Sequence, residues 1–157
     1  MDENRRNPTK TEEDALRILS SLCAKGEHCS GEIVRKIRLW NIGEEGQARI
    51  MSSLGQKGFI DDKRYCRAFI ADKLEFGKWG KRKIAYILKG KGIDESVIGE
   101  ALSEVDDSRF ADVLEQLIES KRRSCRSVYD DKEEAKIIRF ALSRGFDINS
   151  IMKCLRR

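Results

Sequence analysis

The side chains that most often carry out chemistry in proteins are scarce or badly spaced in this sequence. The chain of 157 residues has one histidine, His28, which lies next to Cys29 and five residues after Cys23. A structural zinc site needs about four ligands, usually from pairs of cysteines or histidines at short, fixed spacings. The residues around His28 do not supply such a set, so we interpret it as a solvated turn histidine beside two packing cysteines.

Motifs of hydrolases and nucleotide-binding enzymes are also missing from the sequence. The segment 77–81 contains glycines and a lysine, but no strand is predicted before it and no Ser or Thr follows the lysine, as a phosphate-binding loop requires. The aspartate pairs 61–62 and 106–107 each precede a helical pattern, which favours helix capping over a metal-dependent nuclease site. We therefore expect a protein that is not an enzyme and that has no cofactor and no metal site.

Positive charge is the feature of the sequence that points to a binding partner. The chain has 32 Lys and Arg against 27 Asp and Glu, which gives a net charge of +5. Residues 78–92 hold six basic residues and no acidic one, and two further basic clusters occupy residues 35–38 and 121–126. Like charges at helical spacing repel each other, and a negatively charged partner relieves that repulsion. The alternative interpretation is a solvated face that Asp72, Glu75 and Asp94 balance.

The candidate contact residues come from these clusters and from two repeated arginines. Trp79 can stack on a base, fill a pocket of a partner, or seal the turn between two helices. Arg64 and Arg109 occupy the same place in two similar segments, where they either mark a repeated contact or pair with the aspartates before them. The predicted partner-binding or DNA-binding residues are Arg64, Lys78, Trp79, Lys81, Arg82, Lys83, Lys89, Lys91, Arg122, Arg123 and Arg126.

The elements that must position these residues are helices. Apolar residues recur every three to four positions along most of the chain, as on the buried face of a helix. Thr11, Ser30, Asp94 and Asp147 precede such stretches, and each is a residue type that caps helices. One aspartate of each pair is expected to do the same. A polar stretch, residues 120–131, is expected to link two helices near the C-terminus.

The helical pattern repeats along the chain. Residues 61–65 match residues 106–110, and the Gly-Ile-Asp of residues 92–94 matches the Gly-Phe-Asp of residues 145–147. We therefore predict an all-α fold of tandem three-helix repeats that form an elongated, curved chain. The predicted parts are a disordered tail over residues 1–10 and three-helix repeats over residues 11–60, 61–105 and 106–157.

Sequence features that report on the compartment agree with one another. No apolar run approaches the length of a membrane span, and the first ten residues lack the apolar stretch of a secretion signal. An odd number of cysteines without an export signal favours reduced thiols. We therefore expect a cytoplasmic monomer that does not bind membranes.

Two segments of the chain resemble the signature of the RecX regulatory protein family. These are residues 58–69, GFIDDKRYCRAF, and residues 80–94, GKRKIAYILKGKGID. The resemblance is strongest over residues 58–102 and extends over residues 11–157 through the repeat pattern. Cys66 stands where the family usually has a small alanine, and the first repeat has Asn-Ile-Gly where the Gly-Ile-Asp turn is expected.

The resemblance implies a negative modulator of the RecA recombinase. Such a protein would bind in the groove of the RecA filament on single-stranded DNA and inhibit ATP turnover and strand exchange. This function would belong to DNA repair, DNA recombination and the SOS response. The alternative is a helical-repeat protein that binds single- or double-stranded DNA directly, without RecA, because a basic helical face can follow phosphates.

Overall fold

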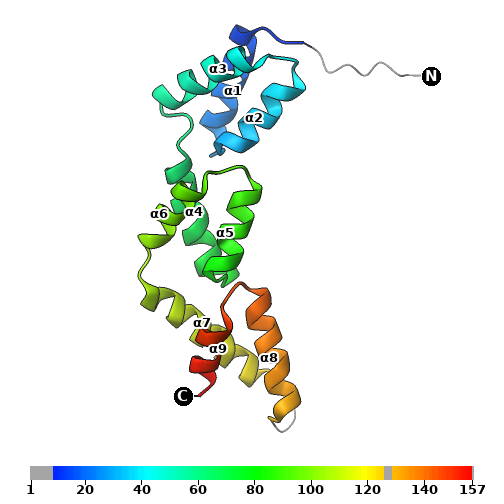
Figure 1. Ribbon diagram of the computed structural model, residues 1–157, viewed down its shortest axis with the longest axis vertical. Coiled ribbons are helices and arrows are strands. Elements are labelled where there is room, and N and C mark those ends of the chain that lie inside the picture. The colour runs from blue at the N-terminus through cyan, green and yellow to red at the C-terminus, as the bar shows by residue number, and fades with distance from the viewer. Residues whose placement is uncertain (1–8, 126–128, 157) are drawn as a thin grey trace, which may run out of the picture. The chain divides into compact units, whose positions relative to one another are not determined.

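Every regular element in the described part of the chain is a helix. The computed structural model describes residues 9–125 and 129–156 (Figure 1), so most of the tail predicted over residues 1–10 lies outside it. The all-α prediction is confirmed, and no helix of the described residues is long and apolar enough to cross a membrane. The elements are α1 (Glu12–Lys25), α2 (Ser30–Leu39), α3 (Glu44–Gln56), α4 (Asp62–Asp72), η1 (Lys73–Gly77), α5 (Lys81–Gly90), α6 (Glu95–Ser103), α7 (Asp107–Arg123), α8 (Asp131–Ser143) and α9 (Ile148–Leu155).

The chain forms two compact units, which are described separately. Unit 1 consists of Met1–Tyr65 and Lys91–Asp94, and unit 2 consists of Cys66–Gly90 and Glu95–Arg157. The turn after α5 therefore belongs to unit 1, although the helices before and after it belong to unit 2. These units do not coincide with the three repeats drawn from the sequence, so the boundaries of those repeats remain a prediction.

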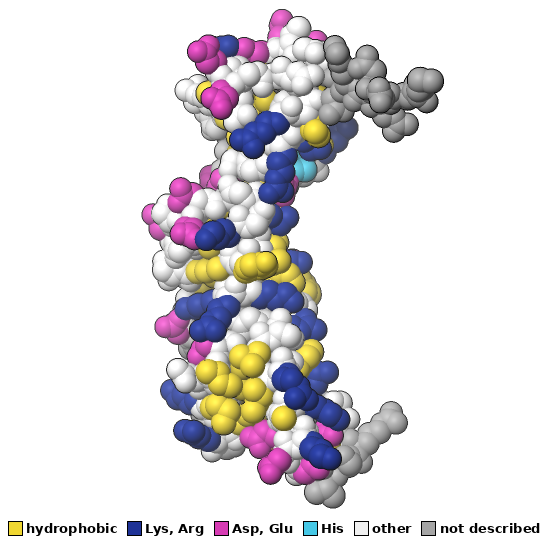
Figure 2. All heavy atoms as spheres, turned by 45° about the vertical axis from the view of Figure 1, so that its right-hand side comes forward, with side chains coloured by type: hydrophobic (Ala, Val, Ile, Leu, Met, Phe, Trp, Pro, Cys, Tyr) yellow, Lys and Arg dark blue, Asp and Glu magenta, His cyan; other side chains and the backbone are white. Residues whose placement is uncertain are grey.

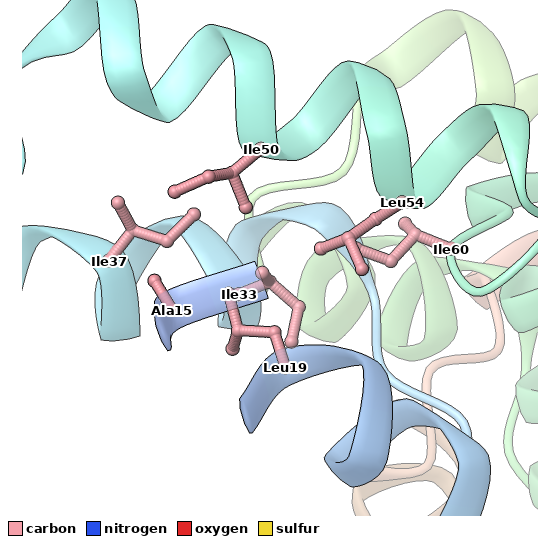
Figure 3. Close-up of a cluster of buried hydrophobic side chains, with 7 residues drawn as sticks. All are labelled: Ala15, Leu19, Ile33, Ile37, Ile50, Leu54 and Ile60. Carbon is pink, nitrogen blue, oxygen red and sulfur yellow. The ribbon is translucent and has the colours of Figure 1, made fainter. Parts of the chain in front are cut away.

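The core of unit 1 lies between α1, α2 and α3 (Figure 3). Its side chains are mostly leucine and isoleucine, with relative exposures of 0–9%. Burial of one such side chain stabilises a fold by about 1.5–3 kcal/mol. The 3.6-residue period of the helix places these residues on one face of each helix. The core residues are Ala15, Leu19, Ile33, Ile37, Ile50, Leu54 and Ile60.

The core of unit 2 is organised by α7, which packs against α8 and α9. Its apolar residues recur at positions three and four apart, so they form one continuous stripe along the helix. The large apolar residues of this stripe are all buried, which fixes the two C-terminal helices on it. The buried residues of α7 are Phe110, Val113, Leu114, Leu117 and Ile118.

Several predicted helix boundaries agree with the structure, and one does not. Thr11, Asp106 and Asp147 each accept the backbone N–H of a residue two or three positions on, at 3.0–3.1 Å. These are the expected capping bonds, which satisfy N–H groups at a helix start. Helix α7, however, continues to Arg123. The prediction that a polar link starts at Ser120 is therefore wrong, because the basic residues there form the last turn of α7.

The aspartate pair at the start of α4 serves two different helices. Asp61 accepts the backbone N–H of Arg64 at 3.0 Å and so caps α4. Asp62 instead faces α2, where its carboxylate accepts the backbone N–H of Ser30 at 2.7 Å and also the Ser30 hydroxyl. The prediction that Ser30 caps α2 is therefore wrong: Cys29 holds the capping position without a side-chain hydrogen bond, and Asp62 supplies the acceptor.

Loss of this distant cap is expected to destabilise unit 1. We expect Asp62→Ala to lower the free energy of unfolding by about 1–2 kcal/mol, because an unpaired helix start costs about that much. Urea unfolding can be followed by the fluorescence of Trp40, which packs against the core of unit 1, in a Trp79→Phe background. Ser30→Ala removes only the hydroxyl contact and should cost less; an equal loss would contradict the capping role.

Two close backbone contacts also shape the units. In unit 1, a Cβ atom added to Gly31 of α2 would overlap the carbonyl oxygen of Lys91. In unit 2, a Cβ atom added to Gly80, just before α5, would overlap the carbonyl oxygen of Gly145. In both units the start of a helix lies directly on a turn that contains a glycine, either Gly92 at φ 85° or Gly145 at φ 95°. Only glycine adopts such backbone angles readily.

Candidate basic site on unit 2

The site begins where α4 continues into a π-helical turn. Element η1 follows α4 directly, and the next residue, Lys78, has a left-handed backbone with φ 54°. The backbone N–H groups of Lys78 and Trp79 both donate to the carbonyl oxygen of Lys73. Short π-helical turns are frequent at functional sites. Here the turn brings two lysines and a tryptophan together.

Trp79 is half-buried, and its ring is occupied by its neighbours. The ammonium nitrogens of Lys73 and Lys83 lie 5.0 Å and 4.4 Å from the ring centroid. The ring of Phe69 meets it edge-on, with 6.2 Å between centroids. Gly77 packs so closely that an added Cβ atom would lie 3.0 Å from the indole. Of the roles considered for Trp79, these contacts favour sealing the turn, because a base can stack only after a lysine has left the ring.

Two further cations reach the same region from α7 and α8. Arg144 donates to the carbonyl oxygen of Gly77 at 2.8 Å, and its guanidinium carbon lies 4.9 Å from the ring centroid of Phe140. The ammonium nitrogen of Lys121 lies 4.1 Å from the same centroid. Lys78 contacts the side-chain amide oxygen of a glutamine on α7 at 3.3 Å. Their neighbours are thus rings, a carbonyl and an amide rather than carboxylates.

Backbone hydrogen bonds hold the start of α5 against the turn after α8. The N–H of Gly80 donates to the carbonyl oxygen of Arg144 at 2.7 Å, and the N–H of Arg82 donates to that of Gly145 at 3.2 Å. A helix start leaves N–H groups without partners, and a helix end leaves carbonyls without partners. The N–H groups at the start of α5 and the carbonyl groups after α8 therefore satisfy one another. These bonds fix the lysines of α5 beside Arg144.

Four cations form the resulting surface: Lys78, Lys83, Lys121 and Arg144. Within the part of the chain that the structure describes, none of them belongs to an ion pair. Together with Trp79 and Phe140 we call them the basic–aromatic surface. Figure 2 shows a face of the molecule on which Lys and Arg side chains flank hydrophobic side chains over the C-terminal helices. Since no acid neutralises these four cations, their charge is available to a negatively charged partner.

The positive charges in the first turn of α5 are unfavourable for the stability of this helix. It holds Lys81, Arg82 and Lys83 and no acidic residue. A helix N-terminus carries a partial positive charge, and each unfavourable charge in the first turn typically costs about 0.3–1 kcal/mol. The first turns of α1, α7 and α8 are acidic, as the dipole favours. The reversed pattern at α5 therefore concentrates positive charge at this end of the helix.

Two of the predicted contact residues on α5 form exposed ion pairs with acidic residues of the same unit. Lys81 forms an ion pair with Asp107 at 2.5 Å, and Lys89 forms one with Glu95 at 2.5 Å. The hydrogen bond with Glu95, and its charge, raise the pKa of Lys89. The alternative of a balanced face thus holds for these two lysines, but the acids that balance them are Asp107 and Glu95 rather than those named from the sequence.

Two other predicted residues lie in unit 1 and are also paired. The guanidinium of Arg64 contacts Glu27 at 3.1 Å and donates to the carbonyl oxygen of Gly58, so only its backbone N–H pairs with a capping aspartate. Lys91 contacts Glu32 at 3.4 Å. Neither therefore belongs to the basic–aromatic surface of unit 2.

The remaining predicted residues are distributed over unit 2. Arg82 is exposed and forms no ion pair with a described residue; its charge contributes to the lowered pKa of Asp147, which hydrogen bonds from Ser150 mainly cause. Arg122 donates to a backbone carbonyl of α9 at 3.4 Å, and Arg123 pairs with an acidic residue one turn earlier at 3.4 Å. Arg126 lies outside the described residues.

The residues that the sequence did not single out are Lys121, Phe140 and Arg144. Lys121 belongs to a basic cluster that was noticed, but Arg144 stands alone before a glycine. Its partner Gly77 is 67 residues away. The only feature of the sequence that pointed to the region of Arg144 was the match between the glycine turns at residues 92–94 and 145–147.

In unit 1, a half-buried polar cluster surrounds Glu32. Its carboxylate lies 3.0 Å from Nδ1 of His28, 3.2 Å from the hydroxyl of Tyr65 and 3.4 Å from Nζ of Lys91. Burial opposes the charged form of Glu32, but these hydrogen bonds and the lysine outweigh it and lower its pKa. His28 is therefore half-buried and bonded rather than solvated. The described residues contain no group of three or more His, Cys, Asp or Glu that could hold a metal ion.

Comparisons with known proteins agree with this architecture. A family model described as the second three-helix domain of RecX matches residues 61–102. The regulatory protein RecX of Clostridium tetani is 30% identical over 154 residues, which cover 95% of this chain and 68% of the relative. The regulatory protein RecX of Chlorobium phaeobacteroides is 30% identical over 141 residues, which cover 90% of this chain and 91% of the relative.

The fold also matches solved structures. The crystal structure of RecX from Lactobacillus salivarius has a TM-score of 0.83 at 21% identity, with 92% of this chain and 94% of the other covered. A second crystal structure, of a regulatory protein RecX, gives the same TM-score over 93% of this chain and 73% of the other. From the sequence relatives, with the fold in agreement, the chain belongs to the RecX family of regulatory proteins.

Proposed function

We propose that this protein is a negative modulator of the RecA recombinase. It binds in the groove of the RecA filament on single-stranded DNA and inhibits ATP turnover and strand exchange, and so regulates DNA repair, DNA recombination and the SOS response in the cytoplasm. Membership of a family whose relatives are named regulatory protein RecX carries this proposal. No chemistry is required of the protein, because tighter binding to one filament conformation than to another shifts the equilibrium between them.

The proposed contact is the basic–aromatic surface. Lys78 and Lys83 were predicted from the sequence, and Lys121 and Arg144 join them in unit 2. A cation beside a carboxylate attracts an anionic partner less strongly, because the neighbouring negative charge offsets part of that attraction. The proposal therefore gives Lys81 and Lys89 a smaller role than their place in the basic stretch indicated.

A pair of matched variants tests this contact. Lys78→Gln with Lys83→Gln removes two unpaired charges, and Lys81→Gln with Lys89→Gln removes two paired ones, so both variants lose the same net charge. We expect the first to raise the concentration for half-inhibition of RecA's DNA-dependent ATP hydrolysis about tenfold, or 1.4 kcal/mol, and the second less than about threefold. Circular dichroism checks that both keep their helices. Equal effects would contradict the proposed contact.

Direct binding to DNA without RecA is the second candidate function, and the unpaired cations favour it as well. Co-sedimentation with preformed RecA filaments over a series of salt concentrations, with naked single-stranded DNA alongside, separates the two. Binding to filaments that is much tighter and less sensitive to salt than binding to naked DNA supports RecA as the partner. Equal binding to both, with a steep loss as salt rises, supports direct DNA binding.

A further inference from the structure

We propose that the basic–aromatic surface binds the phosphodiester backbone of a nucleic acid through cations that aromatic rings hold in position, and that neither Trp79 nor Phe140 stacks on bases. This inference deepens the proposed function, on which it rests, by naming the part of the DNA in the filament that this surface contacts. The carrying observation is that both rings already have cations over them.

The charges of the surface suit phosphate. Four cations from three segments of the chain have uncharged partners, so each can bind an anionic oxygen: Lys78, Lys83, Lys121 and Arg144. A phosphodiester chain carries one negative charge per nucleotide and can meet such cations one after another. Because none of the four must break an ion pair within the described residues, each binds phosphate at a smaller cost than Lys81 or Lys89 does.

The rings act as supports for these charges. A cation over an aromatic face gains about 0.5–1 kcal/mol at an exposed site, which favours one position of a long, flexible side chain. Phe140 lies within 4.1 Å and 4.9 Å of Lys121 and Arg144, and Arg144 is further fixed by the carbonyl of Gly77. Side chains that are already ordered lose less conformational entropy when the ligand binds.

Stacking requires an open ring, and the open rings of unit 2 are elsewhere. Proteins that stack bases present exposed aromatic faces, but Trp79 and Phe140 are half-buried beneath cations. Phe76 and Tyr86 are instead 78% and 77% exposed. These two are the most exposed rings among the described residues of unit 2, ahead of Tyr129 at 39%, so stacking on them serves as the opposing hypothesis in the test.

The test measures binding of the full chain to two labelled oligomers in the absence of RecA. One is a fluorescein-labelled thymidine oligonucleotide of about 20 nucleotides, and the other has the same backbone with every base removed. We expect dissociation constants within about threefold of each other, because only the backbone is read. The logarithm of the binding constant falls linearly with the logarithm of the salt concentration, and the steepness of this line decreases by about 0.7 for each phosphate that the protein no longer neutralises. Lys83→Gln with Lys121→Gln should therefore make the line less steep by about 1.4.

Several results would overturn the inference. These are a loss of affinity of more than tenfold on removal of the bases, a comparable loss in Phe76→Ala with Tyr86→Ala, no measurable binding to either oligomer, or stronger competition by polyglutamate than by the base-free oligomer at equal charge. The last result would identify an acidic protein segment as the ligand. If oligomer binding fails while the chain still inhibits ATP hydrolysis by RecA, the inference fails and the proposed function stands.

Discussion

Replacement of Gly145 by alanine is expected to lower the free energy of unfolding of unit 2 by about 3 kcal/mol. The residue has φ 95°, a region where a side chain costs about 1–3 kcal/mol. The new Cβ atom would also lie 2.5 Å from both the backbone nitrogen and the Cβ atom of Lys83. Those atoms belong to α5, so the helix must shift, and overpacking of this kind costs about 1–3 kcal/mol. Backbone strain and overpacking both arise at residue 145 and both destabilise unit 2.

The two tryptophans allow this effect to be assigned to one unit. Trp40 lies in unit 1 and Trp79 in unit 2, so urea unfolding followed by Trp79 in a Trp40→Phe background reports on unit 2. Gly99→Ala in α6 is the matched control, because nothing lies within 4 Å of the added Cβ atom. That change should stabilise the helix by about 0.5–1 kcal/mol. Urea midpoints that shift in the same direction and by the same amount in Gly145→Ala and Gly99→Ala would contradict the close contact at Gly145.

The repeated turn shows what a sequence pattern can and cannot predict. The match between residues 92–94 and 145–147 identified two turns in which Gly92 and Gly145 have positive φ. The first repeat seemed to lack this turn, yet Asn41 has φ 56° at the corresponding place. Asparagine is one of the few residues other than glycine that tolerates this region. The pattern therefore repeats in backbone conformation where it does not repeat in residue type.

Helices and their buried faces were predictable because both depend on local spacing. The apolar stripe of α7 and the capping bonds of Thr11 and Asp147 involve residues within a few positions of one another. The cap that Asp62 provides for Ser30 spans 32 residues and has no local signal. A residue type shows that a cap is present, but only the packing of the helices shows which helix it serves.

The candidate site was harder to predict for the same reason. The run of residues 78–92 looks uniformly basic, but charge counted along the sequence ignores acids that folding brings close. Asp107 and Glu95 neutralise two of its lysines, whereas Arg144 adds a cation from a distant helix. Predicting the surface therefore required knowledge of how the start of α5 meets the turn after α8, which depends on the glycines Gly80 and Gly145.

The polar cluster of unit 1 leads to the second large effect. We expect Glu32→Ala to lower the free energy of unfolding of unit 1 by about 2 kcal/mol near neutral pH, since hydrogen bonds to a charged group contribute about 1.5–3 kcal/mol. The change leaves Tyr65 and Lys91 without this carboxylate and removes the bond that holds His28. Glu13→Ala, which removes an exposed carboxylate from α1, is the control and should cost a few tenths of a kcal/mol.

The pH dependence of this effect has a definite sign. The pKa of Glu32 is lower in the folded protein than its ordinary value of 4.5, so the folded state favours the ionised carboxylate. Its contribution is complete above the ordinary value and is lost as the pH falls through the lowered one. The difference in stability between the wild type and Glu32→Ala, followed by Trp40 in a Trp79→Phe background, should therefore shrink as the pH falls below the ordinary pKa of 4.5. A difference that persists unchanged at about pH 3 would show that Glu32 stabilises unit 1 by packing rather than by charge.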